Sequence, residues 1–379
     1  MPKTAFSSHF GRELDPEQLL ALMQSGSIDT ILPDVEISPD QRAWIRGDVV
    51  CSSCGAAGAQ IVRTSKGGKT ARAVRQSHFR FVSPTEEDAH HRFCEFSTEA
   101  TEQSSETLID FAKARSAETI FIRSLVCKGI ESRIFDQGSI RAMRQWFFDL
   151  KSATRIRVAI LPDAVDWMEK LNRHPSLRRW PFRPVHAEMP NFDWRDAAIS
   201  QFTEDNFELL EWLFNKRRAS FFPRAFERAK VLSEKHYRQE VFNTSALKPF
   251  YDNALSLAFF VAKNSNFPTK KLHPENYRAS GAPVPLLALC ALLLFVSNWN
   301  MDDAVGLFTK LIGAPNASDE TLGNLIGLNP FHDYAAWETL AIASELAARG
   351  SSGFDYNAQL DAIELRLREE HRLWRATMS

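Results

Sequence analysis

The sequence lacks an apolar run long enough to cross a membrane. Its longest uninterrupted run, from Leu286 to Val296, has 11 residues, whereas a membrane-spanning helix needs about 20. The first residues, Met-Pro-Lys-Thr-Ala-Phe, also lack the apolar core of a signal peptide. The sequence therefore predicts a cytoplasmic protein without a membrane span, in which Leu286–Val296 is a buried helix.

Cysteine is scarce, and neither sign of charge dominates. Five cysteines, an odd number in 379 residues, argue against a disulfide framework and favour a reducing compartment. Lys plus Arg total 46 and Asp plus Glu total 47, so the net charge says nothing about partners and only local charge is informative. Hydrophobic residues make up 44 % of the chain, which excludes disorder along most of its length.

The length predicts two or three domains at about 150 residues each. Four segments differ in pattern: a helical lead-in (1–46), a β-hairpin module (47–115), a small α/β segment (116–190) and a helical domain (191–379). In the lead-in, Asp15 and Ser38 are each followed directly by a proline, and a glutamine stands two residues after that proline. This is the pattern with which a capped helix begins. We expect two short helices there.

The module contains two β-like runs, Gln60–Thr64 and Thr70–Phe81. They flank Ser65–Lys69, whose Gly-Gly pair predicts a hairpin turn. Two helices are expected to follow, one starting at Ser83 and one spanning Glu106–Arg115.

The third segment has the pattern of one βαβ unit. Strands are expected at Thr119–Val126 and Arg155–Leu161, on either side of a helix at Ser139–Lys151. The proline-rich stretch Arg173–Pro190 predicts a long loop. Nearly everything after Phe192 has helical spacing or caps. The expected helices there are Thr203–Arg218, Phe226–Glu240, Leu247–Lys263, Leu286–Asn298, Asp302–Ile312, Asn329–Arg349 and Asp355–Arg375.

Three of the five cysteines lie within 44 residues of one another. Cys51-Ser52-Ser53-Cys54-Gly55 is a CxxCG knuckle, whose spacing lets both thiolates reach one metal ion. Cys51, Cys54, His78 and Cys94 together would complete a closed, tetrahedral Cys3His site for a structural Zn²⁺. The alternative is a set of free cysteines and surface histidines.

His90 and His91 compete with His78 for the histidine position. On a helix, His90 lies four residues and His91 three residues before Cys94, so either could share a face with that cysteine. Cys127 and Cys290 lie at the end of an expected strand and inside an expected buried helix, and we interpret both as core residues.

The CxxCG knuckle, the basic hairpin, the dipeptide His78-Phe79 and the following Cys94 resemble the N-terminal zinc ribbon of CoiA-like competence proteins. The resemblance covers residues 47–115. It implies a zinc-ribbon fold followed by a nuclease-like domain of the PD-(D/E)XK type, and a role in DNA uptake and handling. By analogy it makes mobile-DNA handling or phage defence a reasonable setting.

A nuclease of that type needs carboxylates on adjacent strands to hold Mg²⁺. Glu106, Glu131 and Asp136 are the candidates, but the expected strands Thr119–Val126 and Arg155–Leu161 contain no acid. The sequence therefore leaves open whether the protein is an enzyme, and no catalytic residue is assigned.

Positive charge is concentrated on the hairpin, since Gln60–Thr85 contains no acid. Basic side chains on such a finger can contact a phosphate backbone. The candidate nucleic-acid contacts are Arg63, Lys66, Lys69, Arg72 and Arg75. A second stretch, Arg173–Arg183, interleaves basic residues with Trp180 and Phe182; these rings either stack on bases or pack beneath the loop.

Together these patterns predict an α-rich α+β protein with a zinc-ribbon β-hairpin module, a small α/β segment and a C-terminal helical domain. The predicted function is binding of DNA or RNA through the zinc ribbon, with the helical domain engaging a protein partner or a second copy. The alternatives are a diverged Mg²⁺-dependent nuclease of the PD-(D/E)XK type and a non-catalytic interaction scaffold.

Overall fold

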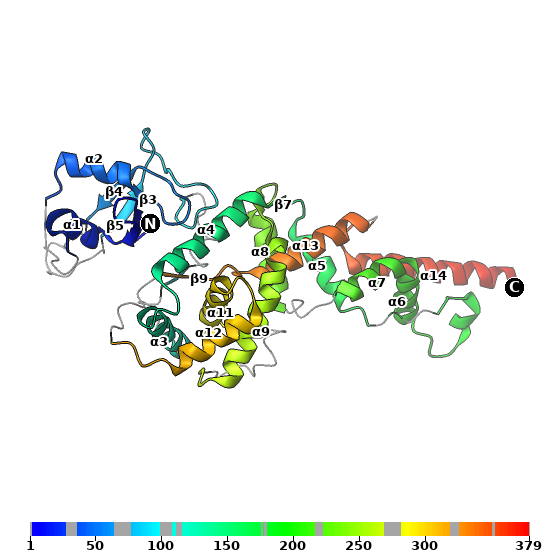
Figure 1. Cartoon of the computed structure of the whole chain (residues 1–379). Helices are drawn as coiled ribbons and strands as arrows, with labels where there is room; N and C mark the ends of the chain where they lie inside the picture. The colour runs from blue at the N-terminus through cyan, green and yellow to red at the C-terminus, as the bar shows by residue number, and fades with distance from the viewer. Residues whose placement is uncertain are drawn as a thin grey trace, which may run out of the picture. The chain divides into compact units, whose positions relative to one another are not determined.

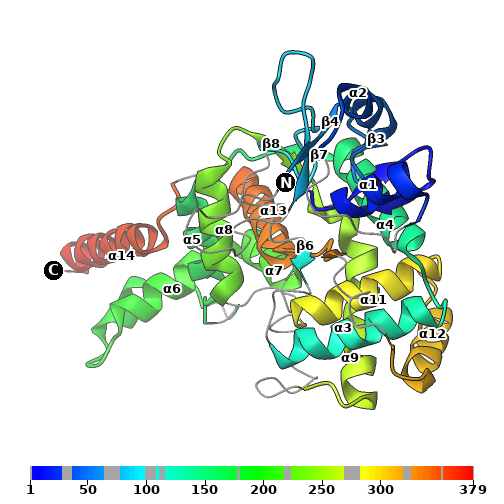
Figure 2. The same cartoon turned by 90° about the vertical axis from the view of Figure 1, so that its left-hand side faces the viewer.

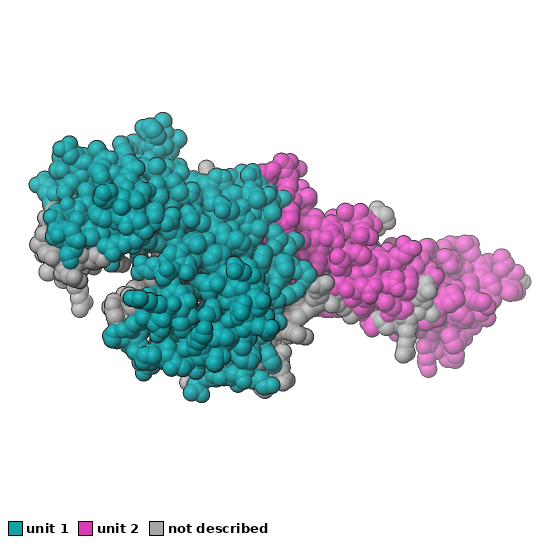
Figure 3. Space-filling model, in the orientation of Figure 1, with its two compact units in different colours: residues 1–155, 245–277, 282–332 teal, residues 156–244, 278–281, 333–379 magenta. Residues whose placement is uncertain are grey.

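A computed structural model describes residues 2–27, 36–63, 77–98, 108–110, 116–175, 177, 180–216, 223–268, 282–318, 326–350 and 353–378. The described part is mostly helical with small antiparallel sheets, so the predicted α-rich α+β class is confirmed. Figure 3 shows two compact units. The first contains residues 1–155, 245–277 and 282–332, and the second consists chiefly of residues 156–244 and 333–379. This division is coarser than the four segments expected from the sequence, which stay a prediction.

The first unit begins with a small antiparallel sheet that the sequence patterns did not predict. Its strands β1 (Ala5–Ser7), β2 (Arg12–Leu14) and β3 (Val49–Val50) lie in the order β2-β1-β3. The two expected helices are present as α1 (Pro16–Ser25) and α2 (Pro39–Asp48), each closed by a capping box at its first turn. A strand of two or three residues is too short to show an alternating pattern.

The predicted hairpin pairs β4 (Ala59–Val62) with β5 (His78–Phe81). The register runs from Ala59 opposite Phe81 to Val62 opposite His78. Phe79 and Phe81 are buried in the core of this part of the chain, while Arg80 is exposed. The predicted turn Ser65–Lys69 lies outside the described residues.

In the first unit, α11 is packed among four other helices, and Figures 1 and 2 show their arrangement. α11 contacts each of the other four, and Leu286–Leu294 is buried without interruption. The predicted buried helix is therefore confirmed. The five are α3 (Ala117–Glu131), α4 (Gln137–Ala153), α9 (Lys248–Asn264), α11 (Val284–Val296) and α12 (Met301–Gly313).

The predicted strand Thr119–Val126 is wrong, because these residues form the middle of α3. Ser116 accepts a hydrogen bond from the Thr119 amide and so caps the helix. Thr119, Ile122, Val126 and Gly129 are buried at intervals of three and four, which is helical spacing. A short apolar run does not by itself distinguish a buried strand from a buried helix. Since only Arg155–Arg157 is extended, as β7, the expected βαβ unit is absent.

Two other expected helices are also corrected. The chain from Ser83 to Thr98 forms turns and an isolated bridge between Val82 and Asp88, not a helix. Within Glu106–Arg115 the described residues Leu108–Asp110 form the strand β6, paired antiparallel with β9 (Ile326–Leu328). A pairing across more than 200 residues leaves no local pattern in the sequence.

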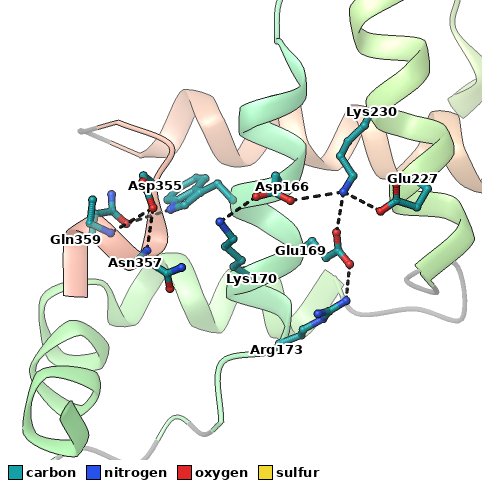
Figure 4. A network of polar contacts seen from close by, with 11 residues as sticks. Asp166, Glu169, Lys170, Arg173, Glu227, Lys230, Asp355, Asn357 and Gln359 are labelled. Atoms are coloured by element: carbon teal, nitrogen blue, oxygen red, sulfur yellow. Dashed lines mark hydrogen bonds and ion pairs between the residues drawn. The ribbon is translucent and has the colours of Figure 1, made fainter. Parts of the chain in front are cut away.

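The second unit has a separate core that includes Trp167, Phe202, Phe226 and Trp337. Ion pairs join α5 (Pro162–Asn172) to α8 (Pro223–Lys235), as Figure 4 shows. The Lys230 ammonium group of α8 contacts the carboxylates of Glu169 at 3.2 Å and Asp166 at 3.5 Å on α5. The elements of the second unit are β7 (Arg155–Arg157), whose first residue ends the first unit, α5 (Pro162–Asn172), α6 (Trp194–Asp205), α7 (Phe207–Lys216), α8 (Pro223–Lys235), β8 (Glu240–Phe242), α13 (Tyr334–Arg349) and α14 (Tyr356–Met378), with a short 3-10 turn at Pro184–Glu188. A second 3-10 turn, Thr244–Leu247, lies where the chain returns to the first unit.

Most helices predicted after Phe192 are present with shifted ends. The expected helix Thr203–Arg218 is two helices, α6 and α7, which separate at Asn206. The expected helix to Glu240 ends earlier, because Glu240 begins β8.

No single described helix is long and apolar enough to cross a membrane. The pair α11 and α12 reaches the required length and composition only across a bend of 116°.

Asp136 caps α4, and its replacement by Ala should lower stability. The Asp136 carboxylate accepts hydrogen bonds of 2.7 Å from the hydroxyl and the amide of Ser139, which lower its pKa in that order. Loss of such a cap costs about 0.5–2 kcal/mol. A lowered pKa means that this contribution is complete above the ordinary pKa of about 3.9 and disappears as the pH falls through the lowered value.

Urea unfolding of the Asp136→Ala variant, followed by circular dichroism between pH 7 and pH 3, measures this difference. Asp136→Asn is the matched control, because Asn caps equally well but does not titrate. An Ala variant as stable as the unchanged protein at pH 7 would contradict the assignment of this cap.

Candidate metal centre

Three cysteines and one histidine converge in the first unit. Ligand atoms of Cys51, Cys54, His90 and Cys94 all lie within 4.8 Å of one another. The Sγ atoms of Cys51 and Cys94 are 3.8 Å apart, and His90 Nδ1 is 3.5 Å from both Cys54 Sγ and Cys94 Sγ. Cys51 and Cys94 are buried, whereas Cys54 and His90 are partly exposed. This Cys3His arrangement could hold a metal ion.

The first two sulfur donors come from a tight turn that follows β3. The Cys51 amide donates to the Ala56 carbonyl at 2.8 Å, and the Gly55 amide donates to the Cys51 carbonyl at 3.0 Å. Gly55 has φ of +70°, a left-handed conformation that favours glycine. The Ser53 amide points at Cys51 Sγ at 3.5 Å, as expected of a CxxCG knuckle.

The other two donors come from the turns after β5. The Asp88 carboxylate accepts hydrogen bonds from the backbone amides of His90 at 3.0 Å and Thr98 at 2.6 Å, so it fixes both ends of this loop. The Cys94 amide donates to the His91 carbonyl at 2.8 Å. His90 also packs edge-on against Phe81 of β5, with ring centroids 5.1 Å apart.

The histidine of the group is His90, in place of the predicted His78. His78 is buried in β5 opposite Val62; because β5 pairs with β4 along its length, His78 stays within the sheet while the donor loop follows it. His91 is turned toward α4, where its ring lies 5.2 Å from that of Phe148. The useful sequence signal is the short spacing of His90 and Cys94, which parallels that of Cys51 and Cys54 and lets one turn supply each half of the site.

Hydrogen bonds between the three thiols lower the pKa of one cysteine and raise the pKa of the other two. The pKa of Cys54 is lowered, chiefly by the hydrogen bond from Cys51 and then by that from Cys94. The pKa of Cys51 is raised to about 12, chiefly by its hydrogen bond to Cys54, and the pKa of Cys94 is raised, chiefly by its contact with Cys51. A metal cation favours the thiolate form of every ligand, so its binding releases protons.

One face of α4 is docked on this part of the chain. The residues of that face recur at intervals of three and four: Arg141, Arg144, Phe148 and Lys151. Arg141 lies over the Phe6 ring, and Arg144 contacts the Glu13 carboxylate. Phe148 packs on the His91 ring, and Lys151 contacts the Glu95 carboxylate. The pairs Arg144–Glu13 and Lys151–Glu95 are buried. Since Glu95 directly follows Cys94, the second pair joins the candidate metal centre to α4; the sequence carried no signal for it.

Gly58 holds the knuckle against the end of β5, and its replacement by Ala should be destabilising. Gly58 has φ of +87°, and an added Cβ would lie 2.1 Å from the Val82 carbonyl oxygen. The Val82 amide donates to the Gly58 carbonyl at 3.1 Å, so the two segments cannot separate without losing this bond. Strain and overlap of this kind cost about 1–3 kcal/mol.

The matched control is Gly47→Ala, because Gly47 lies in α2 and a Cβ there meets nothing within 4 Å. It should raise stability by about 0.5–1 kcal/mol. Thermal or urea unfolding compares the two variants, and equal effects would contradict the predicted overlap at Gly58.

Of the predicted nucleic-acid contacts, only Arg63 is described. It is exposed and directly follows β4. Lys66, Lys69, Arg72 and Arg75 lie outside the described residues. The structure adds Arg80, the exposed residue of β5, which lies opposite Gln60 of β4. Neither Arg63 nor Arg80 makes an ion pair with a described residue.

The basic and aromatic stretch Arg173–Arg183 lies in the second unit. There Phe182 packs on Phe192 and Trp194 at 6.0 Å, and Trp180 packs on Phe192 at 6.4 Å. These contacts are those of rings packed beneath a loop, the second of the two interpretations.

Two of the three candidate nuclease acids are described, and both accept hydrogen bonds from protein groups. Glu131 accepts hydrogen bonds from the backbone amide of Ser318 at 2.7 Å and from its hydroxyl. Asp136 is the cap of α4, and Glu106 lies outside the described residues.

No match to this chain was found among protein-family models, curated proteins or solved structures.

Proposed function

We propose that this protein binds one structural Zn²⁺ at Cys51, Cys54, His90 and Cys94, and that the module built around this ion binds nucleic acid. A tetrahedral site with Zn–S of about 2.3 Å and Zn–N of about 2.0–2.1 Å has S–S edges of about 3.8 Å and S–N edges of about 3.5–3.6 Å. The distances of 3.8 Å and 3.5 Å in the cluster support this ion. Four protein donors leave no open position, which supports a structural role.

The proposed binding of nucleic acid rests on the positive charge of the hairpin beside the metal centre. Arg80 is exposed between the buried Phe79 and Phe81, and Arg63 is exposed at the end of β4. The chain between them contributes four more basic residues and no acid. A finger of this charge suits a phosphate backbone, where each contact releases counterions. The resemblance of residues 47–115 to the CoiA-like zinc ribbon supports the same proposal and a role in DNA handling or phage defence.

Fluorescence anisotropy with single- and double-stranded DNA and RNA at several salt concentrations tests this proposal. Affinity should fall steeply with salt, and Arg63→Ala with Arg80→Ala should reduce the slope of log K against log salt by about one per lost contact. Lys310→Ala is the matched control, since Lys310 is exposed on α12. Absence of binding to all four nucleic acids at low salt would rule the proposal out.

The free cysteines Cys51, Cys54, Cys94, Cys127 and Cys290 support a reducing, cytoplasmic location within this proposal. Engagement of a protein partner by the helical domain is part of the same proposal. Metal-dependent cleavage that is lost in Glu131→Ala would favour the nuclease instead.

A further inference from the structure

Four aromatic side chains line an open pocket in the first unit. Trp146 comes from α4, Phe250 from α9, Phe295 from α11, and Trp299 from the turn between α11 and α12. The cavity measures about 680 Å³, which lies within the range of about 300–1,000 Å³ for small-molecule sites. All four rings are partly exposed, although the helices that carry them are core elements.

The rings are held against one another. The Trp146 centroid is 5.1 Å from that of Trp299 and 5.2 Å from that of Phe250, the latter at an interplanar angle of 87°. Phe250 and Trp299 approach to 4.4 Å. Rings fixed by their neighbours lose little side-chain entropy when a ligand contacts them.

The backbone at the pocket is strained. Asn298 and Trp299 have φ of +50° and +62°, so two consecutive residues other than glycine are left-handed. Asn tolerates this conformation, but a bulky residue such as Trp rarely adopts it. The Trp299 amide donates to the Leu294 carbonyl at 2.6 Å, which holds the turn. Strain retained at a pocket, where it places an aromatic ring, points to a binding function.

The remaining lining distinguishes between ligands. It contains no charged side chain, but it includes the Asn298 amide and the Ser139 hydroxyl. The Asn298 side chain makes no hydrogen bond to a described residue, so its donor and acceptor are both available. A flat, neutral ring with hydrogen-bonding edges fits this combination, since an Asn amide pairs with the edge of a base through two hydrogen bonds.

We propose that this pocket binds one unpaired nucleobase, stacked on Trp146 or Trp299 with its edge toward Asn298. This inference rests on the proposed nucleic-acid binding and names the feature recognised: an unstacked base of a single strand. α4 links the two sites, because its first turns and Trp146 line the pocket while Lys151 near its end contacts Glu95 beside Cys94.

The test uses a single-stranded DNA that contains one 2-aminopurine, and the intact protein. Stacking should quench the fluorescence of the bound base. Trp146→Ala or Trp299→Ala should abolish the quenching and weaken single-strand binding by about 5- to 100-fold. Trp146→Phe should retain most of both, and Trp374→Ala on α14 is the control for an unrelated tryptophan. Asn298→Gly suits the positive φ and should fold normally, yet it should still weaken binding about 5-fold through loss of the amide hydrogen bonds.

A second titration separates the failure of this inference from that of the proposed function. Adenosine should quench the tryptophan fluorescence of the unchanged protein, and Asn298→Gly should need about 5-fold more adenosine for the same quenching. If adenosine binds while no oligonucleotide does, the pocket is supported and the proposed function fails. If oligonucleotides bind without 2-aminopurine quenching, and neither Trp146→Ala nor Trp299→Ala weakens binding, the inference is overturned while the function stands. Quenching by tetramethylammonium but not by adenosine would show a cation site and also overturn it.

Discussion

Replacement of Cys54 by Ser is expected to abolish binding of one Zn²⁺ per chain and to destabilise the structure around the site. A serine hydroxyl is a poor substitute for the cysteine thiolate by which Zn²⁺ is bound. In zinc-finger peptides the bound ion supplies about 10–16 kcal/mol of apparent folding free energy at pH 7. Here the ligand cysteines belong to an apolar core with Leu14, Ile45, Phe79 and Phe81, so we expect a loss of several kcal/mol and not complete unfolding.

The zinc content per chain can be measured by atomic emission after gel filtration. Limited proteolysis of the intact protein reports local unfolding as new cleavage sites within residues 2–98. Removal of the metal with a chelator should reproduce the proteolysis pattern of Cys54→Ser in the unchanged protein. Cleavage confined to other parts of the chain would contradict the expected role of the ion.

The three histidines provide the matched comparison. His90→Ala should weaken zinc binding by orders of magnitude in competition with a chromogenic chelator, because a tetrahedral site loses one of its four donors. His78→Ala and His91→Ala should bind zinc as tightly as the unchanged protein, since neither ring belongs to the group. Loss of zinc in His78→Ala with retention in His90→Ala would reverse the assignment.

The second large effect is expected for Lys151→Met. The Glu95 side chain is 0 % exposed, and its Oε1 contacts the Lys151 ammonium group at 2.6 Å. Its Oε2 has no hydrogen-bond partner among the described residues, so Lys151 is the principal group that offsets burial of this charge. Removal of one partner of a buried ion pair costs about 3–5 kcal/mol, because the other charge stays buried and unpaired.

A double-mutant cycle with Glu95→Leu measures this effect. The double variant should recover most of the stability lost in Lys151→Met, because neither charge then remains buried. Lys310→Met, an exposed change of the same chemistry, should alter the free energy of unfolding by less than about 0.5 kcal/mol. Additive effects in the cycle would contradict a direct pair. Since Glu95 follows Cys94, Lys151→Met should also weaken zinc binding.

Much of the local structure could be predicted because its causes are local. The capping boxes at Asp15 and Ser38 need only residues within one turn, and both formed as expected. Uninterrupted apolar character predicted the burial of α11. The base of the β4–β5 hairpin followed from two β-like runs separated by a glycine pair.

The secondary-structure predictions were wrong where contacts between residues far apart in the sequence determine the local conformation. The composition of Thr119–Val126 suits a strand or a helix equally well. In the structure this run is helical and packs, as part of α3, against α11. Leu108–Asp110 is extended because it pairs with Ile326–Leu328, a partner more than 200 residues away.

The chemistry of the candidate centre could be predicted from the residues alone: three thiols and nearby histidines lie on either side of the basic stretch Gln60–Thr85, which contains no acid. Only the tertiary structure decided which histidine joins the thiols, because the sheet holds His78 while the turns fixed by Asp88 carry His90 to the sulfur atoms. Tertiary structure alone also placed Lys151 on Glu95 and gathered four aromatic rings from α4, α9, α11 and the turn after it. Such groupings depend on how helices pack, and helix packing depends on the shape of whole faces, which no short stretch of residues encodes.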